Sequence, residues 1–455
     1  MSKRGLRIII VGAGKIARTI VSQLVDEGHD VTVVDINPVV IDEFTQSCDC
    51  MGVVGNGATY ATLKEAGIAT ADMFIAVTQS DELNLLCCTI AKQFGDAATI
   101  ARVRNPEYNR EVGYLRDKLG LALIINPELE ATKEIARILF LPTALEINSF
   151  AHGHAEMIKL KIPEGNLLDG KAIAYVGQKS EGVLICAVER NGQLVIPHGD
   201  FVLKSGDVIS IAATRKNYLS FLKLIGFNTK GVRDTMIAGG GIASYYLADQ
   251  LLKSGIAVKI IERDPVRCNE LSDLLPKATI INGDAADKEL LLEAGIHHAQ
   301  SFVPLTGIDE ENIVLTLFAK EVSSAKAVTK ITKINFSEVI NKLDLGSVIY
   351  PKLITAETIL RYVRAKKATI GSNLETLYQI FDARAEALEF SVNKGSAIIN
   401  IPLKDLKFKK DVLIGFINHK DTIIIPSGND IIQEGDSVMV VTTHHGFTEI
   451  EDILL

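Results

Sequence analysis

The first part of the chain alternates two kinds of hydrophobic pattern. Short runs rich in β-branched residues, which are typical of buried strands, occupy positions 7–11, 31–35, 51–54, 73–77, 99–103 and 121–125. Between these runs lie stretches whose apolar residues recur at helical spacing, for example 15–27 and 82–94. Because strands alternate with helices, the pattern predicts βαβ units and a parallel sheet covered by helices on both faces.

The pattern changes between about positions 144 and 227. Short alternating strands are separated there by turn signals, which include Pro163-Glu-Gly165, Arg190-Asn-Gly192, Pro197-His-Gly199 and Ser205-Gly-Asp207. This part is predicted to form a small α+β or β-rich domain.

Both patterns then occur a second time. The glycine-rich segments at Gly12 and Gly239 lie 227 positions apart, and the run from Thr78 to Asn84 returns 228 positions later. Offsets that drift so little along the chain indicate a tandem duplication. The predicted fold class is therefore α/β, with two Rossmann-like, doubly wound parallel-sheet domains that are each followed by a small α+β domain. The predicted domains are 1–143, 144–230, 231–368 and 369–455.

Composition excludes several classes of protein. Among 455 residues, 47% are hydrophobic and 23% charged, as in an ordinary globular protein, and the net charge of −8 argues against a nucleic-acid binder. Every stretch of 18 residues carries a charged side chain, and the start has neither the apolar region nor the cleavage site of a signal peptide. We therefore expect a cytoplasmic protein.

No metal site is expected. The six cysteines lack paired Cys-x2-Cys spacing, and the histidines form only local pairs at 152/154, 297/298 and 444/445. The cysteines are expected to be free structural thiols, as in a reducing compartment.

The repeated glycines predict a phosphate-binding turn. Gly12-Ala13-Gly14 follows a predicted strand and opens a predicted helix, which is the context that a dinucleotide-binding motif requires. The first glycine permits the turn, the second lets the backbone approach a pyrophosphate, and Ala17 takes the third small position. The phosphate is expected at the helix N-terminus; the alternative is a tight turn without a ligand.

An acidic residue follows each glycine motif. Asp35 ends the second strand, 21 positions after Gly14, where a carboxylate accepts hydrogen bonds from a ribose diol. A 2′-phosphate would be repelled there, so NAD(H) or an adenosine nucleotide is expected and NADP is not. The alternative role for Asp35, and for Glu262 in the second copy, is that of a helix-capping acid.

The second copy differs in detail. Gly239-Gly240-Gly241 is intact, but Ser244 places a hydroxyl at the packing position, and Arg263 beside Glu262 would tolerate an additional phosphate. Ligand binding at this second site is therefore less strongly predicted.

Further candidates lie where other strands end. Asn56 and Asp284 are expected to contact adenine or ribose, and Thr78 and Thr306 lie at the ligand-binding edge of the sheet. Arg102 and its counterpart Lys330 would either contact a phosphate or form a surface ion pair. The complete predicted sites are Gly12, Ala13, Gly14, Lys15, Ile16, Asp35, Asn56, Thr78, Gln79 and Arg102, and in the second copy Gly239, Gly240, Gly241, Ile242, Glu262, Asp284, Thr306 and Lys330.

Catalytic machinery is not evident. The small domains repeat turns and not an acid/base set, and no Gly-x-x-x-x-Gly-Lys-[Ser/Thr] loop is present. The sites are thus expected to bind nucleotides without chemistry. An NAD-dependent oxidoreductase remains a less favoured alternative. The basic run from Arg361 to Lys367 is interpreted as a solvated helix end, or alternatively as a site facing a membrane or an acidic partner.

These motifs together resemble the tandem RCK (KTN) family of the TrkA type, over nearly the whole chain. The resemblance rests on the paired glycine motifs, Asp35 and Glu262, the Arg102-Val-Arg104-Asn-Pro-Glu run, and the paired Thr-x-x-Asp-Glu segments.

The resemblance implies a regulatory protein that binds NAD(H) and ATP or ADP. It also implies a homo-oligomer, either a dimer or a tetrameric ring, on the cytoplasmic face of the membrane. The implied partner is a potassium-translocating membrane subunit of the TrkH/TrkG type. Regulation of another cation transporter or antiporter is the alternative.

Overall fold

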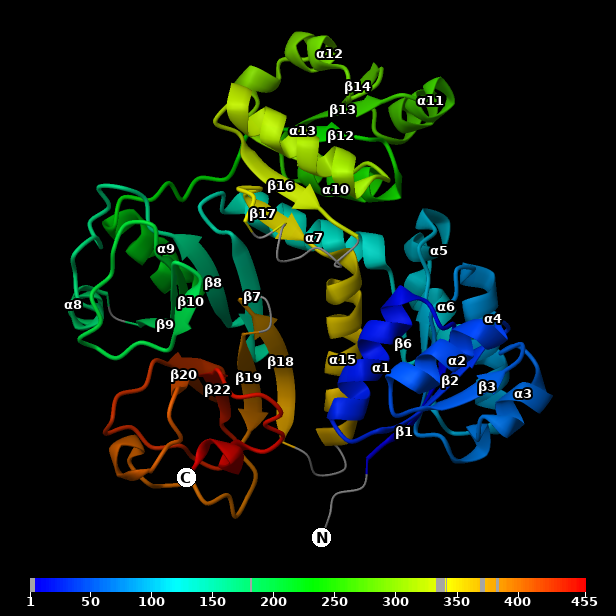
Figure 1. Ribbon diagram of the computed structural model, residues 1–455, viewed down its shortest axis with the longest axis horizontal. Coiled ribbons are helices and arrows are strands. Elements are labelled where there is room, and N and C mark those ends of the chain that lie inside the picture. The colour runs from blue at the N-terminus through cyan, green and yellow to red at the C-terminus, as the bar shows by residue number, and fades with distance from the viewer. Residues whose placement is uncertain (1–4, 181, 333–339, 341, 369–372, 382–383) are drawn as a thin grey trace. The chain divides into compact units, whose positions relative to one another are not determined.

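The computed structural model describes residues 5–180, 182–332, 340, 342–368, 373–381 and 384–455. Its strands form four sheets in this part of the chain, two with six strands and two with five (Figure 1). The predicted boundary at residue 369 lies outside the described residues, as do residues 1–4.

The first six-stranded sheet has strand order β3-β2-β1-β4-β5-β6, and all its strands run parallel. Its strands and the helices between them are β1 (Arg7–Val11), α1 (Lys15–Asp26), β2 (Asp30–Asp35), α2 (Pro38–Ser47), β3 (Met51–Val54), α3 (Tyr60–Glu65), η1 (Ile68–Thr70), β4 (Met73–Ala76), α4 (Asp81–Phe94), β5 (Ala98–Arg102), α5 (Pro106–Arg110), α6 (Val112–Leu119), β6 (Leu123–Ile125) and α7 (Pro127–Phe140). This order reverses between β1 and β4, and a crevice at that point is where doubly wound folds bind ligands.

Hydrophobic packing on both faces explains why the strands are nearly continuous apolar runs. Along β1, Ile8 and Ile10 belong to one core cluster, whereas Ile9 and Val11 belong to the cluster on the other side. Successive side chains of a strand point to opposite faces, so both faces of this sheet are covered.

The second copy repeats the parallel-sheet domain with strand order β14-β13-β12-β15-β16-β17. Its elements are β12 (Asp234–Ala238), α10 (Ile242–Lys253), β13 (Ala257–Glu262), α11 (Pro265–Leu274), β14 (Thr279–Asn282), α12 (Lys288–Glu293), η3 (Ile296–His298), β15 (Ser301–Pro304), α13 (Asp309–Val322), β16 (Lys326–Lys330), β17 (Ser347–Ile349) and α15 (Pro351–Ala368). The predicted duplication and the Rossmann-like topology are thereby confirmed.

A helix of the second copy packs into the core of the first parallel-sheet domain. The described residues of Met1–Ala136 and Val232–Val363 form a single compact unit. Helix α15 comes from the second copy, but its buried residues Ala356, Ile359, Leu360 and Val363 lie in the same hydrophobic cluster as the strands of the first copy. A second contact joins the copies at Tyr246 of α10, whose hydroxyl donates to the Arg104 carbonyl at 3.1 Å.

The small domains form antiparallel sheets with equivalent strand orders, β10-β9-β11-β8-β7 and β21-β20-β22-β19-β18. The first contains β7 (Glu146–Phe150), η2 (Ala151–Gly153), β8 (Ala155–Lys161), α8 (Ile173–Lys179), β9 (Val183–Arg190), β10 (Gln193–Val195), β11 (Val208–Ala213) and α9 (Arg215–Leu224). The second contains β18 (Leu374–Ile380), β19 (Ala385–Ser391), η4 (Leu403–Asp405), β20 (Val412–His419), β21 (Thr422–Ile424), β22 (Ser437–Thr442) and η5 (Ile450–Ile453).

The two small domains share one hydrophobic cluster, within a second compact unit of Arg137–Gly231 and Arg364–Leu455. Phe150 and Met157 of the first pack in one cluster with Phe416 and Met439 of the second. The buried Glu389 carboxylate accepts the Ala151 N–H at 3.0 Å, which satisfies an acid that would otherwise be costly to bury.

Two expectations about side chains can be compared with the structure. The described cysteines are free thiols, as expected. The basic run at 361–367 is not simply a solvated helix end, because Arg364 is only 1% exposed and donates to the Leu377 carbonyl at 3.3 Å.

Candidate functional site

The first glycine motif forms a tight turn between β1 and α1. Gly12 has a φ of +98°, and a Cβ atom there would lie 2.9 Å from the Thr78 backbone nitrogen, so no other residue fits without strain. Gly14, in contrast, faces open space: an added Cβ would meet no atom within 4 Å. The first glycine shapes the turn and the second leaves room for a ligand beside the backbone.

Helix α1 begins at this turn, and the backbone amides of its first turn have no hydrogen-bond acceptor within the helix. Gly14 is the N-cap, it supplies no side-chain hydrogen bond, and the first turn contains no acidic residue. Unpaired N–H groups and the helix dipole therefore favour an anion here. Ala17, at the third small position, is fully buried against the sheet.

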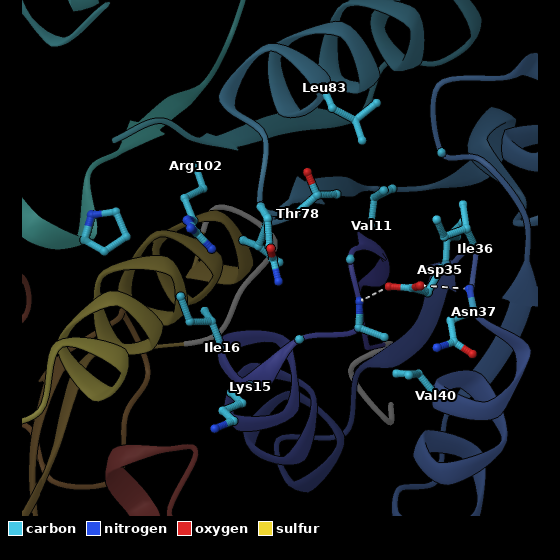
Figure 2. A pocket seen from close by; sticks show the side chains of 18 of the residues that line it. Val11, Lys15, Ile16, Asp35, Ile36, Asn37, Val40, Thr78, Leu83 and Arg102 are labelled. Carbon is cyan, nitrogen blue, oxygen red and sulfur yellow. Dashed lines mark hydrogen bonds between the residues drawn. The ribbon is translucent and has the colours of Figure 1, made fainter. Parts of the chain in front are cut away.

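Asp35 braces the turn from the end of β2. One carboxylate oxygen accepts the Ala13 N–H at 2.8 Å and the other accepts the Asn37 N–H at 2.9 Å (Figure 2). The helix-capping alternative is wrong for Asp35, since the residue that caps α2 is Asn37, whose side chain accepts from Val39. Each carboxylate oxygen has a second lone pair, so these bonds leave Asp35 able to accept from a ribose diol.

A polar bridge holds the ends of β4 and β5 together. The Asn84 side-chain oxygen accepts from both the backbone N–H and the hydroxyl of Thr78, at 2.8 and 2.7 Å. The Asn84 amide donates to the Arg102 carbonyl at 2.9 Å. Asn84 is completely buried, and it was not among the predicted site residues, although the repeat of Thr78 to Asn84 signalled it.

Arg102 is the strongest candidate for binding an anion. Its Nε atom is buried and has no hydrogen-bond partner in the part of the chain that the structure describes, and no ion pair is found for it there. The surface ion pair that the sequence left open is thus not observed. Burial and, secondarily, the nearby Arg104 guanidinium lower the pKa of Arg102, yet an arginine remains charged at neutral pH.

Arg104 and Glu128 are two further charged residues near Arg102. Arg104 lies 3.8 Å from the Glu128 carboxylate and donates to the Gln79 carbonyl at 3.3 Å. Burial raises the pKa of Glu128, and one of its oxygens lacks a hydrogen-bond partner among the described residues. Neither residue was predicted as part of the site.

All ten residues predicted for the first site line one cavity of about 750 Å³ (Figure 2). Such a volume is within the usual range for small-molecule sites. Asn56 lines it but also accepts the Ala58 N–H at 2.9 Å, which shows that it has a structural role in its loop. The second copy contributes to the same cavity through Thr332, Pro351 and Lys352, which sequence reasoning missed because only the fold brings them there.

The second site repeats the local geometry in a smaller cavity of about 270 Å³. Gly239 has a φ of +95°, and Glu262 accepts the Gly240 and Asp264 N–H groups at 2.6 and 2.8 Å, as Asp35 does in the first copy. The additional hydroxyl of Ser244 is buried but satisfied, because it donates to the Gly239 carbonyl at 2.6 Å.

The structure does not bring every predicted residue to the second cavity. Gly239, Gly240, Gly241, Glu262, Asp284 and Thr306 line it, together with Arg263. Ile242 and Lys330 do not. The Lys330 ammonium instead donates to the Thr306 carbonyl at 2.7 Å. Burial lowers the pKa of Lys330.

No group of three or more potential metal ligands occurs among the described residues. In the same part of the chain, no helix is both long and apolar enough to cross a membrane.

Comparison with known families gives matches over all four domains. The TrkA-N domain family matches residues 8–127 and 235–351, and the TrkA-C domain family matches residues 157–226 and 387–455. The Trk system potassium uptake protein TrkA homolog of Archaeoglobus fulgidus is 33% identical over 98% of this chain and 100% of its own length. The Trk system potassium uptake protein TrkA of Haemophilus influenzae is 31% identical over 96% of this chain and 95% of its own.

A solved structure shares the fold. The GsuK channel bound to NAD aligns with a TM-score of 0.60 and 21% identity, over 98% of this chain and 78% of that one.

Proposed function

This chain belongs to the TrkA family of Trk system potassium uptake proteins, and we propose that it is the nucleotide-sensing regulatory subunit of a potassium uptake system. The family is named for potassium uptake and not for a chemical conversion, which agrees with the expectation that the chain is not an enzyme. The observation that carries the proposal is the first cavity, because residues of both copies line it.

The proposed ligands of the first cavity are NAD(H), ADP and ATP. The open space beside Gly14 and the uncapped start of α1 suit a pyrophosphate, while Asp35 suits a ribose diol and disfavours the 2′-phosphate of NADP. Arg102 offers a partly buried cation at the same cavity. The GsuK channel, which has this fold, binds NAD.

Ligand binding regulates only if the ligand has different affinities for two conformations. A ligand in the first cavity would contact residues of both copies. It would therefore favour the conformation in which these residues of the two copies lie close together. Reversing a 1:99 equilibrium takes about 5.5 kcal/mol of differential binding, which several sites in an oligomer would share.

The regulated partner would be a potassium-translocating membrane subunit of the TrkH/TrkG type. Support for a membrane partner comes from the names of the chain's relatives, which refer to potassium uptake, a process that takes place across a membrane. We propose that the protein binds this partner from the cytoplasmic side as a dimer or tetramer.

Arg102→Ala tests the ligand site. We expect NADH, ADP and ATP to bind at least about tenfold more weakly by calorimetry, because a charge-assisted contact with phosphate is lost. The melting temperature should not fall, since Arg102 makes no described hydrogen bond or ion pair that the substitution would remove. Arg116→Ala, at an exposed position of α6, is the control for loss of one positive charge. Unchanged affinity of Arg102→Ala would rule out this site assignment.

A further inference from the structure

The first residues of two equivalent helices line the first cavity. Helix α7 begins at Pro127 and α15 at Pro351, each directly after the last strand of its parallel sheet. The first two residues of both helices, Pro127-Glu128 and Pro351-Lys352, line this one cavity. The second cavity has no such shared wall, because every residue described along it belongs to the second copy.

The two helix starts carry opposite charges. The first turn of α7 contains Glu128 and Glu130, whereas the first turn of α15 contains no acidic residue and has Lys352 at its second position. Glu128 lies beside the cation Arg104, at 3.8 Å. At the position equivalent to Arg104 the second copy has Thr332, and the Lys352 ammonium donates to its carbonyl oxygen.

This hydrogen bond keeps the Lys352 ammonium at the cavity. Lys352 lines the cavity, and a phosphate oxygen is a charged acceptor that forms a strong hydrogen bond with an ammonium, so a phosphate that enters the cavity would attract the Lys352 side chain. The positive end of the α15 dipole acts in the same direction. Figure 2 shows the α15 ribbon on the side of the cavity where Arg102 lies. Arg102 and Lys352 both line this cavity, so each copy contributes a cation to it.

We propose that Lys352 is a phosphate-binding residue of the first nucleotide site, contributed by the second copy. It selects ligands with two or more phosphates over a nucleoside monophosphate. The inference rests on the proposed function and deepens it, because it identifies the group through which the second copy recognises a ligand held by the first.

The anchoring of α15 makes such a contact effective. Leu360 and Val363 of this helix are fully buried in the core of the first domain, so the helix is held against that domain by apolar packing. A phosphate bound by both Arg102 and Lys352 would add a polar link at the start of the same helix. Ligand binding would thus strengthen the association of the two copies.

The test is a calorimetric titration of the full chain and its Lys352→Gln and Lys352→Arg variants with AMP, ADP, ATP and NADH. We expect Lys352→Gln to bind ADP, ATP and NADH about tenfold or more weakly, and AMP within about twofold of the wild-type affinity. Lys352→Arg keeps the charge and should retain most of the affinity. Lys64→Gln, at an exposed position of α3 away from the cavity, controls for net charge, and melting curves verify folding.

Two outcomes would overturn the inference in distinguishable ways. If the wild-type protein binds ADP and ATP, but Lys352→Gln binds them equally well, Lys352 is not a phosphate ligand and the proposed function stands. If Lys352→Gln weakens AMP as much as ADP, the residue does not discriminate phosphate number and the selectivity is refuted. Failure of the wild-type protein to bind any of these nucleotides would overturn the proposed function itself.

Discussion

Asp35 illustrates how one side chain serves structure and binding together. Its two oxygens hold the Ala13 and Asn37 amides, so the turn that faces the cavity is braced by the same carboxylate that would meet a ribose. Glu262 holds the equivalent amides in the second copy with a side chain one methylene longer. Because the same two hydrogen bonds occur in both copies, the acidic residue at this position stabilises the glycine turn whichever ligand each site binds.

Substitution of Asp35 should therefore affect both properties. Asp35→Ala leaves two backbone amides without their acceptor, so we expect a loss of about 1–2 kcal/mol of stability and weaker binding of NADH and ATP. Asp35→Asn keeps an acceptor oxygen for one amide and should lose less stability. Thermal melting and calorimetry measure the two effects separately, and Asp35→Ala with unchanged affinity would contradict a role in binding.

Among the elements, β16 carries a charge that its equivalent strand does not. Lys326 begins β16, whereas Ala98 takes this place in β5. Burial, and secondarily the nearby Lys320 ammonium, lower the pKa of Lys326 to about 8. The folded protein therefore releases this proton more readily than the unfolded chain, in which a lysine has its ordinary pKa.

This difference predicts a pH dependence with a definite sign. Between about pH 8 and pH 10.5 the unfolded chain still binds the proton that the folded protein has lost, so stability should rise with pH in that window. Below pH 8 both states are protonated and the cost of burying the charge is fully present. Lys326→Met should raise stability at pH 7, by on the order of 2 kcal/mol, and flatten this rise.

Chemical denaturation of both proteins at several pH values would measure this effect. The difference between the wild-type protein and the variant isolates Lys326 from the other groups that titrate above pH 8. A difference that stays constant from pH 7 to pH 10 would contradict the prediction.

The elements were largely predictable from the sequence, and the packing between copies was not. The apolar run at 7–11 coincides with β1, because a strand buried on both faces carries an unbroken signal. The run at 51–54 coincides with β3, although this edge strand is largely exposed. All ten predicted residues of the first site line its cavity, since they follow strand ends of known topology. The periodicity of α15 indicates an apolar face, but not that this face belongs to the first copy. Lys352 was missed for the same reason.

At the scale of the whole molecule, α15 makes the first parallel-sheet domain depend on the second copy. Leu360 is fully buried in the core of the first domain, while Leu353 of the same helix is 39% exposed. We expect Leu360→Ala to destabilise the first domain by about 2–5 kcal/mol, as for other buried leucines, and Leu353→Ala to change stability by less than about 1 kcal/mol.

Hydrogen exchange is the suitable measurement, because a chain with several domains does not unfold in one step. The amides of β1, some 350 positions away in sequence, should exchange faster in Leu360→Ala and remain unchanged in Leu353→Ala. If Leu360→Ala accelerates amide exchange only in the second copy, α15 does not stabilise the first domain.

The shared helix also bears on how the two copies have diverged. A domain that takes a core helix from its neighbour loses the ability to exist alone, so neither copy can be deleted without exposing apolar surface. Covalent linkage in one chain then keeps each copy beside its own counterpart. Equivalent positions are free to become different, as Glu128 and Lys352 or Arg102 and Lys330 have. The two copies thus behave as two different subunits that are joined in a single polypeptide.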